Sequence, residues 1–210
     1  MEGQGENRIR LLFGTGNPAK LGAMRRTLAE LPIEILGLAD MDGNAPSVPE
    51  DGKTPLENAR QKAHAYYRAF GVPVFSCDSG LYFENLPQEL QPGVHVRTVG
   101  GKYLTDEEML EYYGGLAERY GNLKARYRHA VCLITGDGQI REIMDESTAS
   151  PLFLLTSVPH SGVLHKGFPL DSLSVDIATG KYFYDLEEAK MDQLAVEKGV
   201  LRFFRTLAIW

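Results

Sequence analysis

The sequence predicts an α/β protein, because short apolar runs typical of strands alternate with stretches that carry apolar residues at helical spacing. Near the start, the apolar run at residues 9–13 leads into a glycine turn at 14–16 and then into an amphipathic helix. Further on, a helix that begins at Thr54 is followed closely by a buried strand at residues 72–78. Strand and helix pairs of this kind are typical of α/β sheets.

The composition narrows the range of partners. The 210 residues carry 22 lysines and arginines against 28 acidic residues, for a net charge of −6. This balance disfavours a nucleic-acid polymer or an anionic membrane as partner, but it allows a small phosphorylated ligand.

Cys77 and Cys132 form neither a disulfide framework nor a zinc spacing, which fits a reduced, cytoplasmic compartment. With no run of about 18 apolar residues and no signal peptide, we expect a soluble protein with one domain over residues 1–210, built as one body or two closely joined lobes.

The first helix carries a candidate anion site. Asn17 suits the N-cap, and Lys20 stands in the first turn, where the helix dipole is already positive. A bound anion would account for a cation there, although an exposed lysine without a ligand would cost only roughly a few tenths of a kcal/mol. Residues 14–19 also match the looser dinucleotide pattern G-x-G-x-x-A, with Glu34 or Asp40 as a ribose ligand.

Acidic side chains stand at two places suited to chemistry. Glu50 and Asp51 lie in a loop rich in glycine, proline and aspartate; such a pair is usually solvated, but it is also what a hard divalent cation requires. Residues 72–78 are predicted to form a buried strand that stops at Asp78 and turns on a glycine, with 81–83 as a further extended stretch. Because open α/β sheets carry their chemistry where strands end, Asp78 is the first candidate for a catalytic acid, although aspartate also commonly begins turns.

The helix over residues 54–70 has a strong start signal, with Thr54 as the cap and Glu57 closing a capping box. Asn58 and Lys62 are four residues apart on one flank of its buried stripe. A lysine beside a core stripe usually extends its charged end to solvent, but it could also reach a phosphate at the edge of a cleft.

The second half of the sequence predicts four elements. They are a helix that begins with a capping box at Thr105, a β-hairpin, a short strand and a C-terminal helix. The hairpin joins residues 127–135 to 139–144 through a Gly-Asp-Gly turn, and the short strand covers 151–155. The last helix is predicted from about Leu186, to within ~2–4 residues.

Four motifs stand in order along the first half of the chain. They are Thr15-Gly16-Asn17-Pro18-Ala19-Lys20; the set Glu50, Gly52, Thr54, Glu57, Asn58, Ala59, Lys62 and Ala63; the run Asp78-Ser79-Gly80-Leu81; and Pro92-Gly93 with Arg97 and Gly100. Together they resemble four motifs of the Ham1/inosine triphosphatase family of nucleoside triphosphate pyrophosphatases. The family motifs are T-G-N-x-x-K, E-x-G-x-T-x-x-E-N-A-x-x-K-A, D-S-G-L and P-G-x-x-x-x-R-x-x-G. This chain matches the last of them with one residue fewer between the glycine and the arginine. No single motif is decisive, but the ordered set is fairly specific.

This resemblance implies a long, twisted mixed β-sheet flanked by helices, in two lobes with a central cleft, and a homodimer. It also implies hydrolysis of a nucleoside triphosphate, such as the non-canonical purines ITP or XTP, to the monophosphate and pyrophosphate. The cofactor would be Mg²⁺, with Mn²⁺ as a substitute, held by Glu50 and Asp78, and Asp78 would act as general base on the metal-activated water. The implied substrate-binding residues are Thr15, Gly16, Asn17, Lys20, Asn58, Lys62, Ser79, Phe168, Asp171 and Lys190.

The second half departs from the family pattern. Where the family has G-F-G-Y-D-P and the purine-reading S-H-R, this chain has Gly167-Phe168-Pro169-Leu170-Asp171-Ser172 and Leu194-Ala195-Val196-Glu197. Cys77 replaces the first acid of the family's D-D-S-G-L. We therefore expect intact phosphate and metal chemistry, but no strong preference for inosine or xanthosine triphosphate over ordinary nucleotides.

Two other classes of function stay open. One is a dinucleotide-binding oxidoreductase built on Gly14-Thr15-Gly16, which has no use for Glu50 and Asp78 as metal ligands. The other is a nucleotide-binding or regulatory relative that has lost catalysis, which the absence of S-H-R allows.

Overall fold

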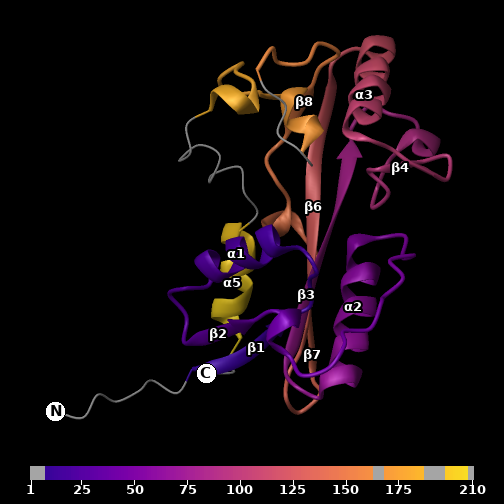
Figure 1. The fold of residues 1–210 in the computed structure, drawn as a ribbon. Helices are drawn as coiled ribbons and strands as arrows, with labels where there is room; N and C mark the ends of the chain where they lie inside the picture. Colours follow the sequence, from indigo (N-terminus) through magenta and orange to yellow (C-terminus); the bar gives the residue numbers. More distant parts are fainter. Residues whose placement is uncertain (1–7, 163–167, 187–196, 208–210) are drawn as a thin grey trace. The chain divides into compact units, whose positions relative to one another are not determined.

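The computed structural model describes residues 8–162, 168–186 and 197–207 (Figure 1). Within these residues, one sheet has seven strands in the order β2-β1-β3-β6-β8-β9, with β7 paired to β6. Its strands are β1 Ile9–Phe13, β2 Ile33–Leu36, β3 Val74–Phe83, β6 Leu123–Ile134, β7 Ile140–Ile143, β8 Phe153–Leu155 and β9 Ser174–Asp176, while β4 Thr98–Val99 and β5 Lys102–Tyr103 form a separate pair. The α-helices are α1 Pro18–Thr27, α2 Pro55–Phe70, α3 Asp106–Tyr120 and α5 Glu197–Thr206. Since β1 is parallel to β2 and β3 whereas β6 is antiparallel to β7 and β8, the predicted mixed sheet flanked by helices is confirmed.

The chain divides into two compact units, and two of the four boundaries between them fall within the long strands β3 and β6. The first unit comprises the chain up to Ser79, then His129–Thr148 and the last helix. The second comprises Gly80–Arg128 and the stretch that begins at Ala149. The central cleft and the single domain over residues 1–210 stay predictions.

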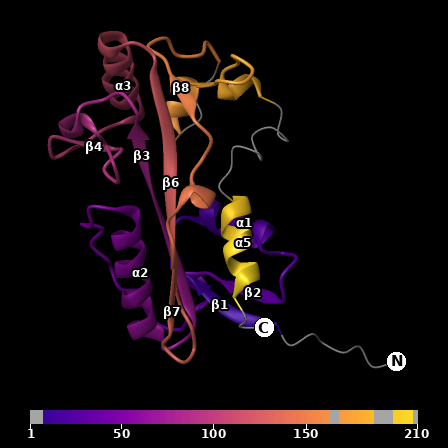
Figure 2. The same ribbon diagram turned by 180° about the vertical axis from the view of Figure 1, so that it is seen from behind.

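In the first unit, helices cover both faces of the strands. α2 lies along one face, and α1 and α5 lie along the other (Figures 1 and 2). On the α5 side, the rings of Phe13 and Phe75 stack with centroids 4.6 Å apart, and Phe204 meets Phe75 edge-on at 5.0 Å. On the α2 side, Ala59 and Ala63 are fully buried. This burial on both faces explains why the end of β1, at residues 11–13, and the start of β3 are apolar without alternation.

The second unit has its own core, centred on α3. Tyr113 on that helix is fully buried and donates its hydroxyl hydrogen to the backbone oxygen of Val96 at 2.7 Å. The helix begins at Thr105, whose Oγ1 accepts from the Glu108 N–H at 3.2 Å, while the Glu108 carboxylate accepts from the Thr105 N–H at 2.9 Å. The predicted capping box is therefore confirmed.

The predicted start of α2 is confirmed in part. The Oγ1 atom of Thr54 accepts from the Glu57 N–H at 3.2 Å, and Gly71 ends the helix with a φ of 64°. The Glu57 carboxylate, however, accepts from the N–H of Lys53 at 2.6 Å, one residue before the cap. The prediction that Glu57 closes a reciprocal box with Thr54 is therefore wrong.

The central strand does not stop at Asp78. β3 continues through Asp78 and Gly80 to Phe83, so the predicted strand end and glycine turn are wrong. Gly80 is needed for space instead, because a Cβ atom there would lie 2.8 Å from the carbonyl oxygen of Gly93. That close approach allows Leu81 and Gly93 to exchange two backbone hydrogen bonds, of 2.9 and 3.1 Å. Asp78 consequently lies inside the sheet, where only 9% of the residue is exposed.

The remaining predicted elements match with shifted boundaries. β6 and β7 confirm the hairpin, although β6 begins at Leu123 rather than at 127, and β8 confirms the strand near 151–155. Leu186 itself has an extended backbone, and residues 187–196 lie outside the described residues. None of the helices that the structure describes combines the length and the apolar character needed to cross a bilayer.

Gly199 offers a test of the packing between α5 and the backbone at Glu146–Thr148. A Cβ atom on Gly199 would collide with the backbone carbonyl of Ser147, which cannot give way as a flexible side chain would. We expect Gly199→Ala to lower the free energy of unfolding by about 2 kcal/mol or more. The matched control is Gly22→Ala in α1, whose Cβ would meet only the tip of Arg26 at 3.7 Å and should stabilise by up to ~1 kcal/mol. Urea unfolding followed by circular dichroism measures both, and equal stabilities would contradict the packing.

Candidate functional site

A buried cluster of charged side chains lies beside β3 in the first unit. Lys62 on α2 places its ammonium between two carboxylates, with Nζ 2.8 Å from Glu50 Oε2 and 3.2 Å from Asp78 Oδ1. The side chains of Lys62 and Asp78 are only 10% and 11% exposed, whereas that of Glu50 is 49% exposed. The structure thus brings together three of the predicted site residues.

Asn58 holds the second oxygen of Asp78. Its Nδ2 donates to Asp78 Oδ2 at 2.9 Å, and its Oδ1 accepts from the N–H of Gly52 at 2.8 Å. The Asp78 carboxylate needs a donor and the Gly52 N–H needs an acceptor, so the two hydrogen bonds together fix the orientation of the Asn58 amide. Asn58 was predicted to bind substrate; here it is almost fully buried and links the loop, α2 and β3.

The sequence of α2 explains how these side chains reach the strand. Ala59 and Ala63 are completely buried, and their small size allows the helix to lie close to the sheet. Asn58 and Lys62 precede these alanines and are four residues apart, so they share one face of the helix. Both side chains therefore point toward the same segment of β3.

The charge on Lys62 is secured by its neighbours. Burial acts to lower the pKa of Lys62, but Asp78 and Glu50 outweigh it, so that the pKa lies above its ordinary value. The ammonium is therefore charged at neutral pH and balances the buried carboxylate of Asp78. A buried charge without such a partner would be strongly destabilising.

Cys77 and Ser79 lie on the opposite face of β3. Side chains alternate between the two faces of a strand, so both point away from the face that carries Asp78. Burial raises the pKa of the Cys77 thiol to about 12, which leaves it neutral. Ser79, predicted to bind substrate, is therefore not part of the Glu50–Lys62–Asp78 cluster.

The predicted anion site at the start of α1 is open to solvent. Asn17 Oδ1 accepts from the N–H of Lys20 at 3.3 Å, as expected of an N-cap, and Thr15 Oγ1 accepts from the N–H of Asn17 at 3.2 Å. Gly16, Asn17 and Lys20 are all exposed, so an anion can approach this end of the helix.

His129 on β6 was not among the predicted site residues. Burial lowers its pKa to about 4; the positive charge of Lys20 acts in the same direction, and Asp78 opposes it. The imidazole is therefore neutral at neutral pH and lies within electrostatic range of both groups. No local pattern could have revealed it, because the proximity arises only when β6 lies beside β3 in the sheet.

The described residues contain no group of three or more His, Cys, Asp or Glu side chains that could hold a metal ion. Mg²⁺ does not require one, because it is usually bound through one or two carboxylates together with waters and substrate phosphates. Glu50 and Asp78 fit this pattern, since their carboxylates already converge on a single cation, the ammonium of Lys62.

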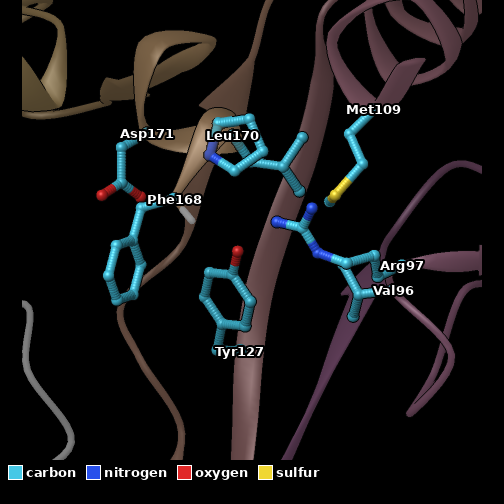
Figure 3. A pocket seen from close by; sticks show the side chains of 8 residues that line it. Val96, Arg97, Met109, Tyr127, Phe168, Leu170 and Asp171 are labelled. Carbon is cyan, nitrogen blue, oxygen red and sulfur yellow. The ribbon is translucent and has the colours of Figure 1, made fainter. Parts of the chain in front are cut away.

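The second unit contains a pocket that includes two further predicted residues, Phe168 and Asp171 (Figure 3). Its lining consists of Val96, Arg97, Met109, Tyr127, Phe168, Pro169, Leu170 and Asp171. The residue Phe168 is 58% exposed, so its ring is available for stacking. The volume of about 160 Å³ is below the roughly 300–1,000 Å³ of sites for drug-sized ligands, so the pocket suits a ring-sized part of a ligand.

Two polar residues of this pocket were not among the predicted ligand contacts. Arg97 is anchored by Asp106, with Nη1 2.6 Å from Oδ1. The hydroxyl of Tyr127 points toward the space between Phe168 and Arg97 in Figure 3. Burial, and then the charge of Asp171, raise the pKa of Tyr127, so its hydroxyl stays protonated and able to donate.

One predicted substrate-binding residue, Lys190, lies outside the described residues. Gly167 and residues 194–196, where the sequence departs from the family motifs, also lie outside them. Of the predicted base-binding residues, Phe168 and Asp171 are thus the two that the structure describes.

Comparison with known proteins places this site in context. Residues 11–151 match the model of the Ham1 family. A dITP/XTP pyrophosphatase of Thermus thermophilus is 38% identical over 122 residues, which cover 58% of this chain and 55% of the relative. A dITP/XTP pyrophosphatase of Porphyromonas gingivalis is 34% identical over 131 residues, 62% of this chain and 66% of the relative. The chain therefore matches little more than half of the Thermus protein's length.

Solved structures extend the likeness to nearly the whole chain at the level of the fold. A HAM1 protein from Coxiella burnetii superposes with a TM-score of 0.75 at 20% identity, covering 94% of this chain and 97% of its own. The Staphylococcus aureus Ham1 protein gives a TM-score of 0.73 at 18% identity, with coverages of 93% and 98%.

Asn58 provides a stability test of the buried cluster. Asn58→Leu keeps the approximate size but removes the partner of the Gly52 N–H and of Asp78 Oδ2, so we expect the free energy of unfolding to fall by about 3 kcal/mol. The matched control is Gln61→Leu on the same helix. Among the described residues the Gln61 Oε1 atom is buried without a hydrogen-bond partner, and Gln61 Nε2 donates to Asp51 Oδ1 at 2.7 Å. Because Asp51 is exposed, water can replace that donor, so Gln61→Leu should change stability by less than about 1 kcal/mol. Urea unfolding compares the two, and a similar loss in both would refute the role of Asn58.

Proposed function

Since the chain belongs to the Ham1 family, we propose that it hydrolyses a nucleoside triphosphate to the nucleoside monophosphate and pyrophosphate. The observation that carries this proposal is the buried carboxylate of Asp78, held by Asn58 and Lys62 next to Glu50. The Thermus and Porphyromonas relatives are both named dITP/XTP pyrophosphatase, which supports non-canonical purine nucleoside triphosphates as the substrate class.

In the proposed reaction, one water molecule cleaves the bridge between the α- and β-phosphates. The water oxygen joins phosphorus, the bridging oxygen leaves with pyrophosphate, and Asp78 takes the proton as general base. Asn58 keeps Oδ2 of Asp78 engaged, so the oxygen left for this task would be Oδ1, which Lys62 contacts at 3.2 Å. The neutral imidazole of His129 lies in the same region without adding a charge to it.

Glu50 and Asp78 are the residues that would hold Mg²⁺, or Mn²⁺ in its place. A bound divalent ion would neutralise charge on the phosphates and make the attacking water more acidic, so that a carboxylate can accept its proton. Glu50 is half exposed, so it can adjust its position without leaving a buried charge behind.

The phosphates would be held by cations and by the open end of α1. We assign this role to Lys20, Lys62 and the N–H groups around Gly16 and Asn17. The N-terminus of a helix favours an anion because its dipole is positive there, and Lys20 adds a full positive charge. Thr15 and Ser79 are assigned as further hydrogen-bond partners of the substrate.

The base would lie in the pocket of Figure 3, with the ring of Phe168 stacked on it and Asp171 at the wall. Lys190 completes the assigned set. The family match ends at residue 151, before all three of these residues.

Family membership argues against a dinucleotide-binding oxidoreductase built on Gly14-Thr15-Gly16. The G-x-G-x-x-A pattern is a weak signal, and such an enzyme would not need Glu50 and Asp78 as metal ligands. A relative without catalysis is the second candidate, which the absence of the S-H-R motif allows. We further propose that the protein is a cytoplasmic homodimer that binds neither nucleic-acid polymers nor membranes, consistent with its net charge of −6.

Asp78→Asn tests the catalytic role directly. The change keeps the shape of the side chain but removes the base and one metal-binding charge, so pyrophosphate release with Mg²⁺ should fall by at least about 100-fold. Asp42→Asn, at an exposed position in a loop of the same unit, is the control and should keep the wild-type rate. Circular dichroism verifies that both variants are folded. Near-wild-type turnover by folded Asp78→Asn would remove Asp78 from the mechanism.

Base specificity is tested by comparing kcat/KM for dITP and XTP with values for dATP and GTP. We expect a preference well below several hundredfold, because residues 194–197 offer one polar side chain where the family has S-H-R. A pocket without dedicated hydrogen-bonding groups discriminates by only about 1–3 kcal/mol per group. A preference of several hundredfold would show instead that other residues, with Tyr127 and Arg97 as the nearest candidates, read the base.

A further inference from the structure

The ammonium of Lys62 lies where two acidic ligands converge. Its Nζ contacts Glu50 Oε2 at 2.8 Å and Asp78 Oδ1 at 3.2 Å, and these are the carboxylates assigned to the metal. We propose that Lys62 and a divalent cation compete for Glu50 and Asp78, so that metal ion and phosphate bind cooperatively. This inference rests on the proposed function, because it takes the assigned metal ligands as its starting point.

The charges in the cluster support competition. Two carboxylates and one ammonium leave a net charge of −1, which the free protein can hold because Glu50 is half exposed while Lys62 and Asp78 are nearly buried. A divalent ion added beside the ammonium would bring two positive centres against the same oxygens, and like charges at contact distance repel strongly where water is scarce. Binding of the metal therefore requires Lys62 to leave.

The hydrogen bonds around Asp78 allow such an exchange without loss of order. Lys62 contacts Oδ1, whereas Asn58 holds Oδ2 and is itself fixed by the Gly52 N–H. Departure of Lys62 would free one oxygen while the carboxylate keeps its orientation. The lysine side chain has a flexible four-carbon stem, so its charged end can move while the backbone of α2 stays in place.

When the Lys62 ammonium leaves the two carboxylates, it needs another anion as partner, and a bound phosphate would be that anion. The exchange therefore couples the two ligands: phosphate draws Lys62 away and raises the affinity for the metal ion. By linkage, the metal ion must raise the affinity for phosphate by the same factor. Free protein would accordingly hold its metal ion weakly until a phosphorylated ligand arrives.

Mn²⁺ binding to the free protein, followed by electron paramagnetic resonance, tests the competition without any turnover. Lys62→Met should bind Mn²⁺ at least about 10-fold more tightly than wild type, within the usual range of coupling between sites. Lys62→Arg keeps the positive charge and should not bind more tightly. Lys53→Met, which removes an exposed lysine three residues from Glu50, controls for a general change in net charge. Equal or weaker binding by folded Lys62→Met, or equal tightening by Lys53→Met, would overturn the proposal.

A second measurement uses the wild-type protein and sulfate as a phosphate-like oxyanion. Sulfate should tighten Mn²⁺ binding to wild type several-fold and leave Lys62→Met unaffected. No effect of sulfate on wild type, or the same effect on both proteins, would refute the coupling. The two proposals can fail separately. If the protein hydrolyses nucleoside triphosphates but sulfate does not change Mn²⁺ binding, only the competition between Lys62 and the metal ion is refuted. If sulfate changes Mn²⁺ binding but no hydrolysis is found, only the proposed reaction is refuted.

Discussion

The interaction on which the first unit depends is the ion pair between Lys62 and Asp78. Both side chains are nearly buried, and a buried charge is tolerated only when it is paired and hydrogen-bonded. That requirement fixes the distance between α2 and β3, and the small Ala59 and Ala63 make the distance attainable. Through Asn58 and Gly52 it also fixes the loop that carries Glu50. A constraint of stability therefore assembles the same groups that the proposed chemistry requires.

The alternation of β3 divides the predicted site between two faces of the sheet. Asp78 faces α2 and belongs to the acidic cluster, whereas Cys77 and Ser79 face the side covered by α1 and α5. Lys20 lies in the first turn of α1, on that second side, and its charge affects the pKa values of both Cys77 and His129, as does the charge of Asp78. Charges on one face of β3 thus affect titratable groups on the other face, although the strand separates the side chains.

The sequence allowed local features to be predicted well and tertiary neighbours poorly. Helix caps such as Thr54 and Asn17 follow from the chemistry of a few adjacent residues, and they were found where expected. The strand end at Asp78 was predicted wrongly, because aspartate and glycine are common in turns and the true need for Gly80 is a distant backbone, that of Gly93. The bond from Asn58 to Asp78 and the position of His129 depend on segments brought together only by folding. Family motifs supplied the residues of the site, but not these contacts.

The replacement of the family's first acid by Cys77 bears on whether catalysis has been lost. Its thiol is neutral, since burial raises the pKa to about 12, so the replacement removes a negative charge from one face of β3. Glu50 and Asp78 converge on Lys62 through the other face, and their contacts do not involve residue 77. The residues proposed as general base and metal ligands therefore keep their contacts without that acid. The substitution reduces the negative charge near Lys20, which favours the approach of a polyphosphate, and it gives no physical reason to expect an inactive site.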